Sequence, residues 1–174
     1  MSWSNAPIKA YHGTTLNYAP AIAAGPDPPK GSALTDFGLG FYVTTNLRQA
    51  KDWANDRHRK RGAHPAAVIE FDVDRDWLAQ LDSLAFVVES ANSGYWDFVS
   101  FCRNGRTYLR NTLPDHGRKI APANRHYQVV YGPVSLWPQR HVLKDCDQIS
   151  FHMKPHMMTG LQYAQTLSGS PDFP

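Results

Sequence analysis

Asp36-Phe37-Gly38-Leu39-Gly40-Phe41-Tyr42-Val43-Thr44-Thr45 joins a glycine-rich turn to a tail of aromatic and β-branched residues. Glycines lack a Cβ, so the backbone can turn sharply here or approach a ligand closely. The composition of the tail predicts a strand that leaves the turn directly. An acidic residue, a flexible turn and an aromatic on a strand are suited to a small-molecule site, in which Tyr42 would stack on a flat heterocycle.

A second run, Tyr11-His12-Gly13-Thr14-Thr15, has the same design, a polar ring beside a glycine on a short predicted strand. The imidazole of His12 could donate to a ribose hydroxyl while the bare backbone of Gly13 contacts an amide. Each residue has an ordinary alternative. His12 could be a hydrogen-bonded structural histidine, and Tyr42 could be a packed core aromatic.

The chain length of 174 residues and the 42% hydrophobic content indicate one packed domain, which we place at residues 1–167 with a flexible tail at 168–174. Interspersed helices and strands predict an α+β fold. The predicted strands are 8–12, 36–45, 66–73, 84–88, 127–134 and 148–151. The predicted helices are 17–24, 46–61, 75–81, 95–102 and 155–166.

Several protein classes are disfavoured. No apolar run approaches the roughly 18 residues of a membrane span, and the first residues do not resemble a signal peptide. We therefore expect a cytoplasmic protein without a membrane partner, although a toxin exported without a signal peptide would have the same features. Cys102 and Cys146 are isolated, so free thiols are expected. We predict no metal site, since Pro155 interrupts His152 and His156 and no third ligand is in view.

Basic residues gather in two segments. The run Arg57–Arg61 ends a predicted helix, where cations complement the helix dipole, and it is interpreted as a solvated helix end with phosphate binding as the alternative. The segment Arg106–Arg125 is basic and broken by prolines, which leaves a nucleic-acid-binding domain as a further alternative. The net charge of +3 permits an anionic ligand such as a dinucleotide but falls short of a nucleic-acid footprint.

Taken together, the blocks resemble the ADP-ribosyltransferase-like superfamily of the diphtheria-toxin and poly-ADP-ribose-polymerase type. The resemblance is closest to a bacterial branch that pairs a YHGT motif with a DFGxGFY motif, here Tyr11–Thr14 and Asp36–Thr44. It continues through residues 49–54, 96–99, 131–134 and 147–152. It therefore covers residues 8–163, nearly the whole chain.

The resemblance implies a split, bent β core with flanking helices that binds NAD as a substrate, with a His-Tyr-Glu set on three strands. His12 would hold the adenosine ribose hydroxyl, Gly13 would bind the nicotinamide carboxamide, and Tyr42 would stack on the nicotinamide ring. The remaining expected NAD-binding residues are Thr14, Asp36 and Gly40.

The third position of the set is the main departure, because the late strand offers Gln148 where the superfamily has glutamate. Cleavage of the ribose–nicotinamide bond builds an oxocarbenium-like cation, which a carboxylate stabilises and an uncharged amide does not. Gln148 could orient the ribose while Asp36, Asp147 or a substrate group supplies the charge. It could equally mark a slow enzyme or a nucleotide binder.

The resemblance implies a NAD-dependent mono-ADP-ribosyltransferase or NAD glycohydrolase that acts as a bacterial toxin or effector. Its catalytic residues would be His12, Tyr42 and Gln148. The acceptor is left open among protein, nucleic acid, small molecule and water, and an antitoxin or immunity protein would be a further partner. The alternative is a catalytically weak or inactive nucleotide-binding or regulatory module of the same fold.

Overall fold

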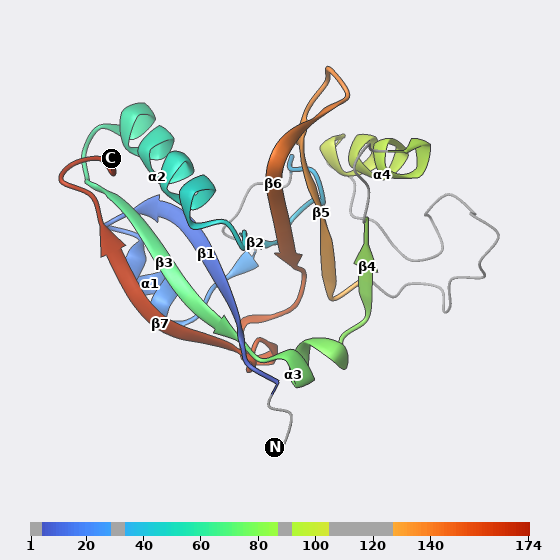
Figure 1. Ribbon diagram of the computed structural model, residues 1–174, viewed down its shortest axis with the longest axis horizontal. Helices are drawn as coiled ribbons and strands as arrows, with labels where there is room; N and C mark the ends of the chain where they lie inside the picture. The colour runs from blue at the N-terminus through green and yellow to red at the C-terminus, as the bar shows by residue number, and fades with distance from the viewer. Residues whose placement is uncertain (1–4, 29–33, 87–91, 105–126) are drawn as a thin grey trace. The chain divides into compact units, whose positions relative to one another are not determined.

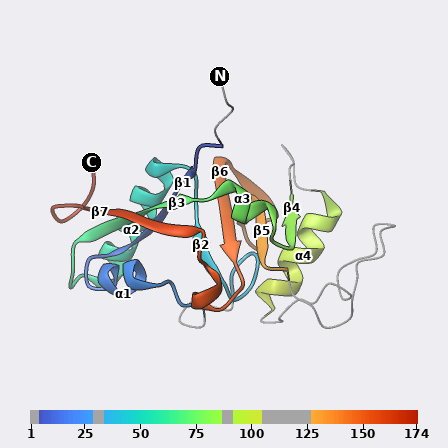
Figure 2. The ribbon, with the colours of Figure 1, turned by 90° about the horizontal axis from the view of Figure 1, so that it is seen from below.

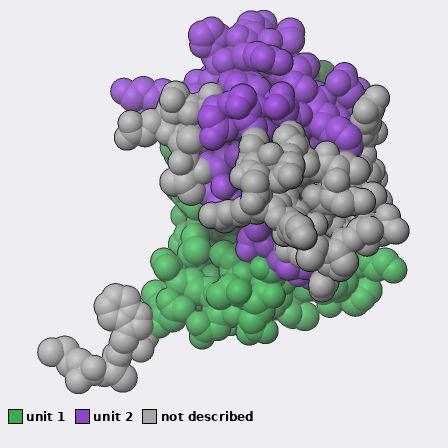
Figure 3. Space-filling model, turned by 90° about the vertical axis from the view of Figure 1, so that its right-hand side faces the viewer, with its two compact units in different colours: residues 1–27, 43–81, 154–174 green, residues 28–42, 82–153 purple. Residues whose placement is uncertain are grey.

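A computed structural model describes residues 5–28, 34–86, 92–104 and 127–174. Helices and strands are interspersed along the chain, and the strands form two separate sheets (Figure 1). The predicted α+β class is confirmed. The chain divides into two compact units, which are distinguished by colour in Figure 3. The first unit contains residues 1–27, 43–81 and 154–174, and the second contains residues 28–42 and 82–153.

The first unit contains an antiparallel sheet of three strands in the order β1, β3, β7. Its strands are β1 (Ile8–Thr15), β3 (Ala66–Val73) and β7 (Leu161–Ser168). Its helices are α1 (Ala19–Ala24), α2 (Leu47–Arg61) and α3 (Arg75–Ala79), with the 3-10 helix η3 (Pro155–Met157) before β7.

Helix α2 begins where the sequence predicts, because the side chain of Asn46 accepts a hydrogen bond from the backbone N–H of Gln49. It packs on the sheet of the first unit (Figures 1 and 2). Small side chains allow this close packing, since Ala50 and Ala54 of the helix meet Ala66 and Val68 of β3 in one buried cluster.

The second unit contains a sheet of four strands in the order β2, β6, β5, β4. These are β2 (Phe41–Val43), β6 (His141–Phe151), β5 (Val129–Leu136) and β4 (Ser83–Ala85). Helix α4 (Ser93–Arg103) supplies most of an aromatic core. The buried members of that core are Phe37, Tyr95, Trp96, Phe98, Val99, Cys102, Tyr127 and Val130.

One predicted strand is shorter than expected, and one predicted helix is wrong. The predicted strand over residues 36–45 is mostly a turn, and only Phe41–Val43 forms a strand, because Gly38 turns the chain with a φ of 79°. The predicted helix over residues 155–166 is instead η3 followed by β7, which pairs with β3 from Ala67 to Val73. Pairing with a buried strand has overridden local helix propensity there.

Residues 169–173, expected to be a flexible tail, are hydrogen-bonded to the first unit. Gly169 donates its backbone N–H to the carbonyl of Ala66, whose own N–H donates to the carbonyl of Pro171. The buried side chain of Asn55 donates to the carbonyl of Phe173 at 3.0 Å and accepts from its N–H at 2.8 Å. The tail therefore packs along α2 and β3.

No helix within the described ranges is both long and apolar enough to cross a membrane. The predicted basic segment Arg106–Arg125 lies outside the described residues.

Candidate functional site

The predicted site residues belong to both units. His12, Gly13 and Thr14 lie on β1 of the first unit. The predicted residues of the second unit are Asp36, Gly40, Tyr42 and Gln148. The structure joins Asp36 to Gln148 by a direct hydrogen bond, and it places Tyr42 on β2, directly after the turn that begins at Asp36.

Gly13 is required by packing inside the first unit. A Cβ at this position would collide with the backbone carbonyl of Ala50 and would lie 3.0 Å from the backbone nitrogen of Ala54 and 3.1 Å from the Cβ of Trp53. The glycine therefore lets β1 and α2 approach each other closely. Thr14 is buried beside it, and His12 is half-buried opposite Ile69 of β3.

The ends of the two motifs meet through a backbone bridge. Tyr11 and Thr44 each donate a backbone N–H to the carbonyl of the other, at 2.8 and 2.9 Å. Tyr11 directly precedes His12, and Thr44 follows Tyr42 by two residues. Within the first unit, the start of the first motif is thus paired with the last residues of the second.

The hydroxyl of Tyr42 closes the glycine-rich turn from inside. It donates to the carbonyl of Gly38 at 2.7 Å, accepts from the backbone N–H of Phe37 at 3.0 Å, and lies 2.8 Å from the hydroxyl of Thr35. Burial raises the pKa of this phenol well above its usual value, so Tyr42 is no acid or base near neutral pH. Its partly exposed ring stacks on Phe37, with centroids 6.3 Å apart.

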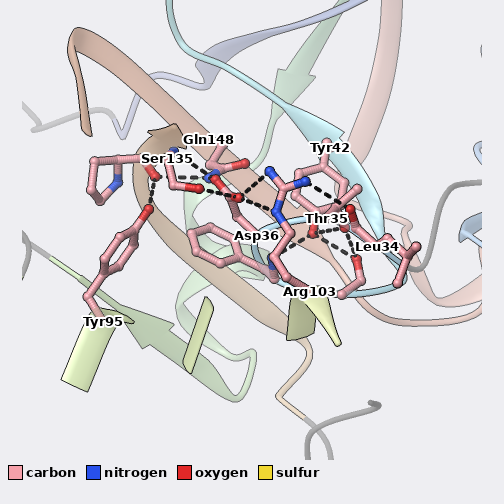
Figure 4. A network of polar contacts seen from close by, with 11 residues as sticks. Leu34, Thr35, Asp36, Tyr42, Tyr95, Arg103, Ser135 and Gln148 are labelled. Atoms are coloured by element: carbon pink, nitrogen blue, oxygen red, sulfur yellow. Dashed lines mark hydrogen bonds and ion pairs between the residues drawn. The ribbon is translucent and has the colours of Figure 1, made fainter. Parts of the chain in front are cut away.

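Asp36 is the centre of a buried polar network (Figure 4). Arg103 donates to its Oδ1 through Nε at 2.9 Å and Nη2 at 2.6 Å, and the Ser135 hydroxyl donates to the same oxygen at 2.5 Å. Its Oδ2 accepts from the backbone N–H of Ser135 and from the Gln148 amide, both at 2.7 Å. Only 3% of Asp36 is exposed, so these five bonds replace solvation by water.

Gln148 is held in one orientation by the same network. Its Nε2 donates to Asp36 and, at 2.9 Å, to the carbonyl of Pro133, which also accepts from the hydroxyl of Tyr95 at 2.9 Å. Both neighbours are acceptors, so the amide nitrogen must face them and the amide oxygen must point the other way. Gln148 is 4% exposed and acts as a structural donor to Asp36.

This network bears on whether Asp36 can supply the negative charge that Gln148 lacks. The Asp36 carboxylate is paired with the Arg103 guanidinium, which also donates to the carbonyl of Leu34 at 2.9 Å. The field of Asp36 still reaches its surroundings, since burial first and Asp36 second raise the pKa of Tyr95. The Asp36 carboxylate therefore binds donors of the protein itself, and its contact with NAD stays a prediction.

Gly40 has a packing role as well. A Cβ there would collide with the hydroxyl of Ser150 and would lie 2.9 Å from the ring of His152. The glycine thus lets the turn lie against β6, and the imidazole of His152 makes a 2.8 Å hydrogen bond with the carbonyl of Leu39. Its role towards NAD also stays a prediction.

Sequence reasoning missed the partners of Asp36. Arg103 and Ser135 are 67 and 99 residues from it along the chain. Ser135 directly follows the Tyr131–Val134 block, and Arg103 directly follows the predicted helix 95–102, but neither position has a local signal for a buried partner. Only the strand register and the helix direction bring them together.

Two other chemistries receive no support. Burial, with a smaller effect of Asp36, raises the pKa of Cys102 to about 12, so its thiol is not a ready nucleophile. In the described ranges, no three histidine, cysteine or acidic side chains are grouped to hold a metal ion.

Comparison with known proteins identifies the family. Residues 8–155 match a family described as "Protein of unknown function (DUF3990)". A search of curated proteins found no match. Because the match covers most of the chain, this protein belongs to the DUF3990 family of proteins of unknown function.

Proposed function

We propose that this protein is a NAD-dependent mono-ADP-ribosyltransferase, with NAD hydrolysis as its activity when water is the acceptor. One observation carries the proposal, namely that the three residues of the expected His-Tyr-Glu set lie on three separate strands. His12 is on β1, Tyr42 on β2 and Gln148 on β6, and β2 is the neighbour of β6 in its sheet.

In the proposed reaction, the bond between the ribose C1′ and the nicotinamide nitrogen breaks, and its electron pair leaves with nicotinamide. A nucleophilic atom of the acceptor then bonds to C1′ and loses its proton. His12 would hold the adenosine ribose hydroxyl, Gly13 the nicotinamide carboxamide, and Tyr42 the nicotinamide ring. The oxygen of Gln148 would accept a hydrogen bond from the nicotinamide ribose.

The amide at position 148 predicts a slow enzyme. Two unit charges about 4 Å apart interact by ~4 kcal/mol at an effective dielectric constant of ~20. If a carboxylate gained this energy only in the transition state, its absence would lower the rate by about three orders of magnitude. The Arg103 partner of Asp36 reduces what that carboxylate can supply instead.

A second candidate is a nucleotide-binding or regulatory module without turnover. The observation that favours it is the burial of Gln148, whose amide nitrogen is committed to Asp36 and Pro133. A toxin or effector role, with an antitoxin or immunity protein as partner, belongs to the first candidate and depends on turnover.

The test incubates purified protein and a cell lysate with NAD labelled in both the nicotinamide and the adenine. A transferase releases nicotinamide and labels a macromolecule, a glycohydrolase only releases nicotinamide, and a binding module does neither while NAD binding is detected by calorimetry. His12→Ala should abolish release, whereas Lys9→Gln, which removes a half-exposed ammonium group, should not. Equal release by wild type and His12→Ala would sink the assignment.

A further inference from the structure

The structure divides the basic end of α2 into side chains with and without an acidic partner. The Lys60 ammonium lies 2.8 Å from the Asp56 carboxylate, and both His58 and Arg59 lie 3.7 Å from carboxylate oxygens of Asp172. Arg57 and Arg61 have no acidic partner in the part of the chain that the structure describes.

Arg57 is the unusual member of the run. It is half-buried, and its pKa is lowered first by that burial and then by the charge of Arg61. Residues four apart lie on one face of a helix, so two arginines at this spacing repel each other. A guanidinium withdrawn from water without a counter-ion is unfavourable. The dipole acts mainly on the last turn, which Arg57 precedes, so the helix end compensates it poorly.

Exposed aromatic rings accompany the two arginines. The guanidinium carbon of Arg61 lies 5.6 Å from the ring centroid of Tyr18, which is 44% exposed. Trp53, at 39% exposure, lies one turn before Arg57. One face of the helix carries a row of three side chains, Trp53, Arg57 and Arg61. At a helical rise of ~1.5 Å per residue the row is about 12 Å long, and a single phosphate group is shorter than that.

We propose that Arg57, Arg61, Tyr18 and Trp53 form a binding site for single-stranded nucleic acid. The guanidinium groups bind backbone phosphates, and unpaired bases stack on the aromatic rings. Bases in a duplex are stacked on each other, so their faces are closed to the two rings. This site lies within the first unit and does not depend on the proposed NAD chemistry.

Two double variants test the site with matched net charge. Arg57→Gln/Arg61→Gln removes the unpaired cations, and Arg59→Gln/Lys60→Gln removes two paired cations from the same helix. Fluorescence anisotropy of a labelled 12-nucleotide single-stranded DNA measures affinity against salt. Two phosphate contacts predict a slope of log K against log salt of about −1.4 for the wild type. The first variant should bind at least tenfold more weakly with a slope near zero, and the second should stay within twofold of the wild type.

Three outcomes would overturn the proposal. They are equal losses in the two variants, equal binding of a duplex of the same sequence, and displacement of the oligonucleotide by pyrophosphate at an equal concentration of phosphate groups. The last would show that the bases contribute nothing. Thermal unfolding checks that both variants fold, and removal of the like-charge pair should not lower the midpoint for Arg57→Gln/Arg61→Gln.

Discussion

The two units both contain carboxylates paired with a cation, but in opposite surroundings. In the first unit, Lys9 lies 2.8 Å from Asp72, and the two side chains are 51% and 36% exposed. In the second, Arg103 meets Asp36 at 2.6 Å where the acid is 3% exposed. Water can replace a lost partner at the first pair but not at the second. Similar distances therefore predict very different sensitivities to substitution.

Asp36→Ala should have the largest effect. It leaves the Arg103 guanidinium, both donors of Ser135 and the Gln148 amide without their acceptor. Removing one partner of a buried ion pair typically lowers the free energy of unfolding by about 3–5 kcal/mol. Urea unfolding measures the change, and Asp72→Ala is the matched control on the exposed pair. Similar losses in the two variants would break the comparison between the units.

The sequence predicted only part of the structure that underlies the difference between the two units. Strand β3 has the predicted bounds, because the eight residues Ala66–Val73 have strong β-propensity between turn signals. The turn at Gly38 and the strand at Tyr42 were also visible. The contact between Asp36 and Gln148 joins residues 112 apart, so it depends on the register of β5 and β6. Strand β7 was missed because its partner, β3, is far away in sequence.

Gly13→Ala should have the next largest effect on stability. It tests whether the first unit depends on close packing of β1 against α2. The added methyl group would collide with the carbonyl of Ala50. Overpacking of this kind typically lowers the free energy of unfolding by about 1–3 kcal/mol. Gly62→Ala is the control, since a Cβ there meets nothing within 4 Å and only the φ of 64° is unfavourable. A smaller loss at Gly13 than at Gly62 would contradict the packing argument.

Gln148→Glu should have an intermediate effect that depends on pH. The new carboxyl would face the Asp36 carboxylate and the carbonyl of Pro133, so its folded-state pKa should rise above the unfolded value of about 4.3. The folded variant then binds more protons, and stability falls as the pH rises through the folded pKa. Relative to the wild type, it should be less stable at pH 8 than at pH 5, by about 1.4 kcal/mol for each unit of pKa shift.

Thermal unfolding at the two pH values measures this difference. Asp36→Asn is the control background, because it removes the charge that opposes the new carboxylate. In Asp36→Asn/Gln148→Glu the difference in stability between pH 5 and pH 8 should shrink. An undiminished difference would show that Asp36 does not determine the need for an amide at position 148.

Lys9→Gln should have the smallest effect. A hydrogen bond from Lys9 is the main cause of the lowered pKa of Glu70, with a smaller contribution from Gln165. A lowered pKa stabilises the fold above the unfolded pKa, and this stabilisation is lost as the pH falls through the folded pKa. The variant should therefore be slightly less stable than the wild type near pH 7, and the two stabilities should converge in acid, where Glu70 is protonated in both. An NMR titration of the Glu70 carboxyl should show its pKa returning towards the usual value, and Lys144→Gln should leave it unchanged.

Release of nicotinamide from NAD by the purified protein tests the proposed function most directly. We expect slow release by the wild type, no release by His12→Ala on β1, and strongly reduced release by Tyr42→Ala on β2. Both variants must unfold near the wild-type temperature for the comparison to count. NAD that remains intact with folded wild type, alone and in the presence of a cell lysate, would contradict the assignment.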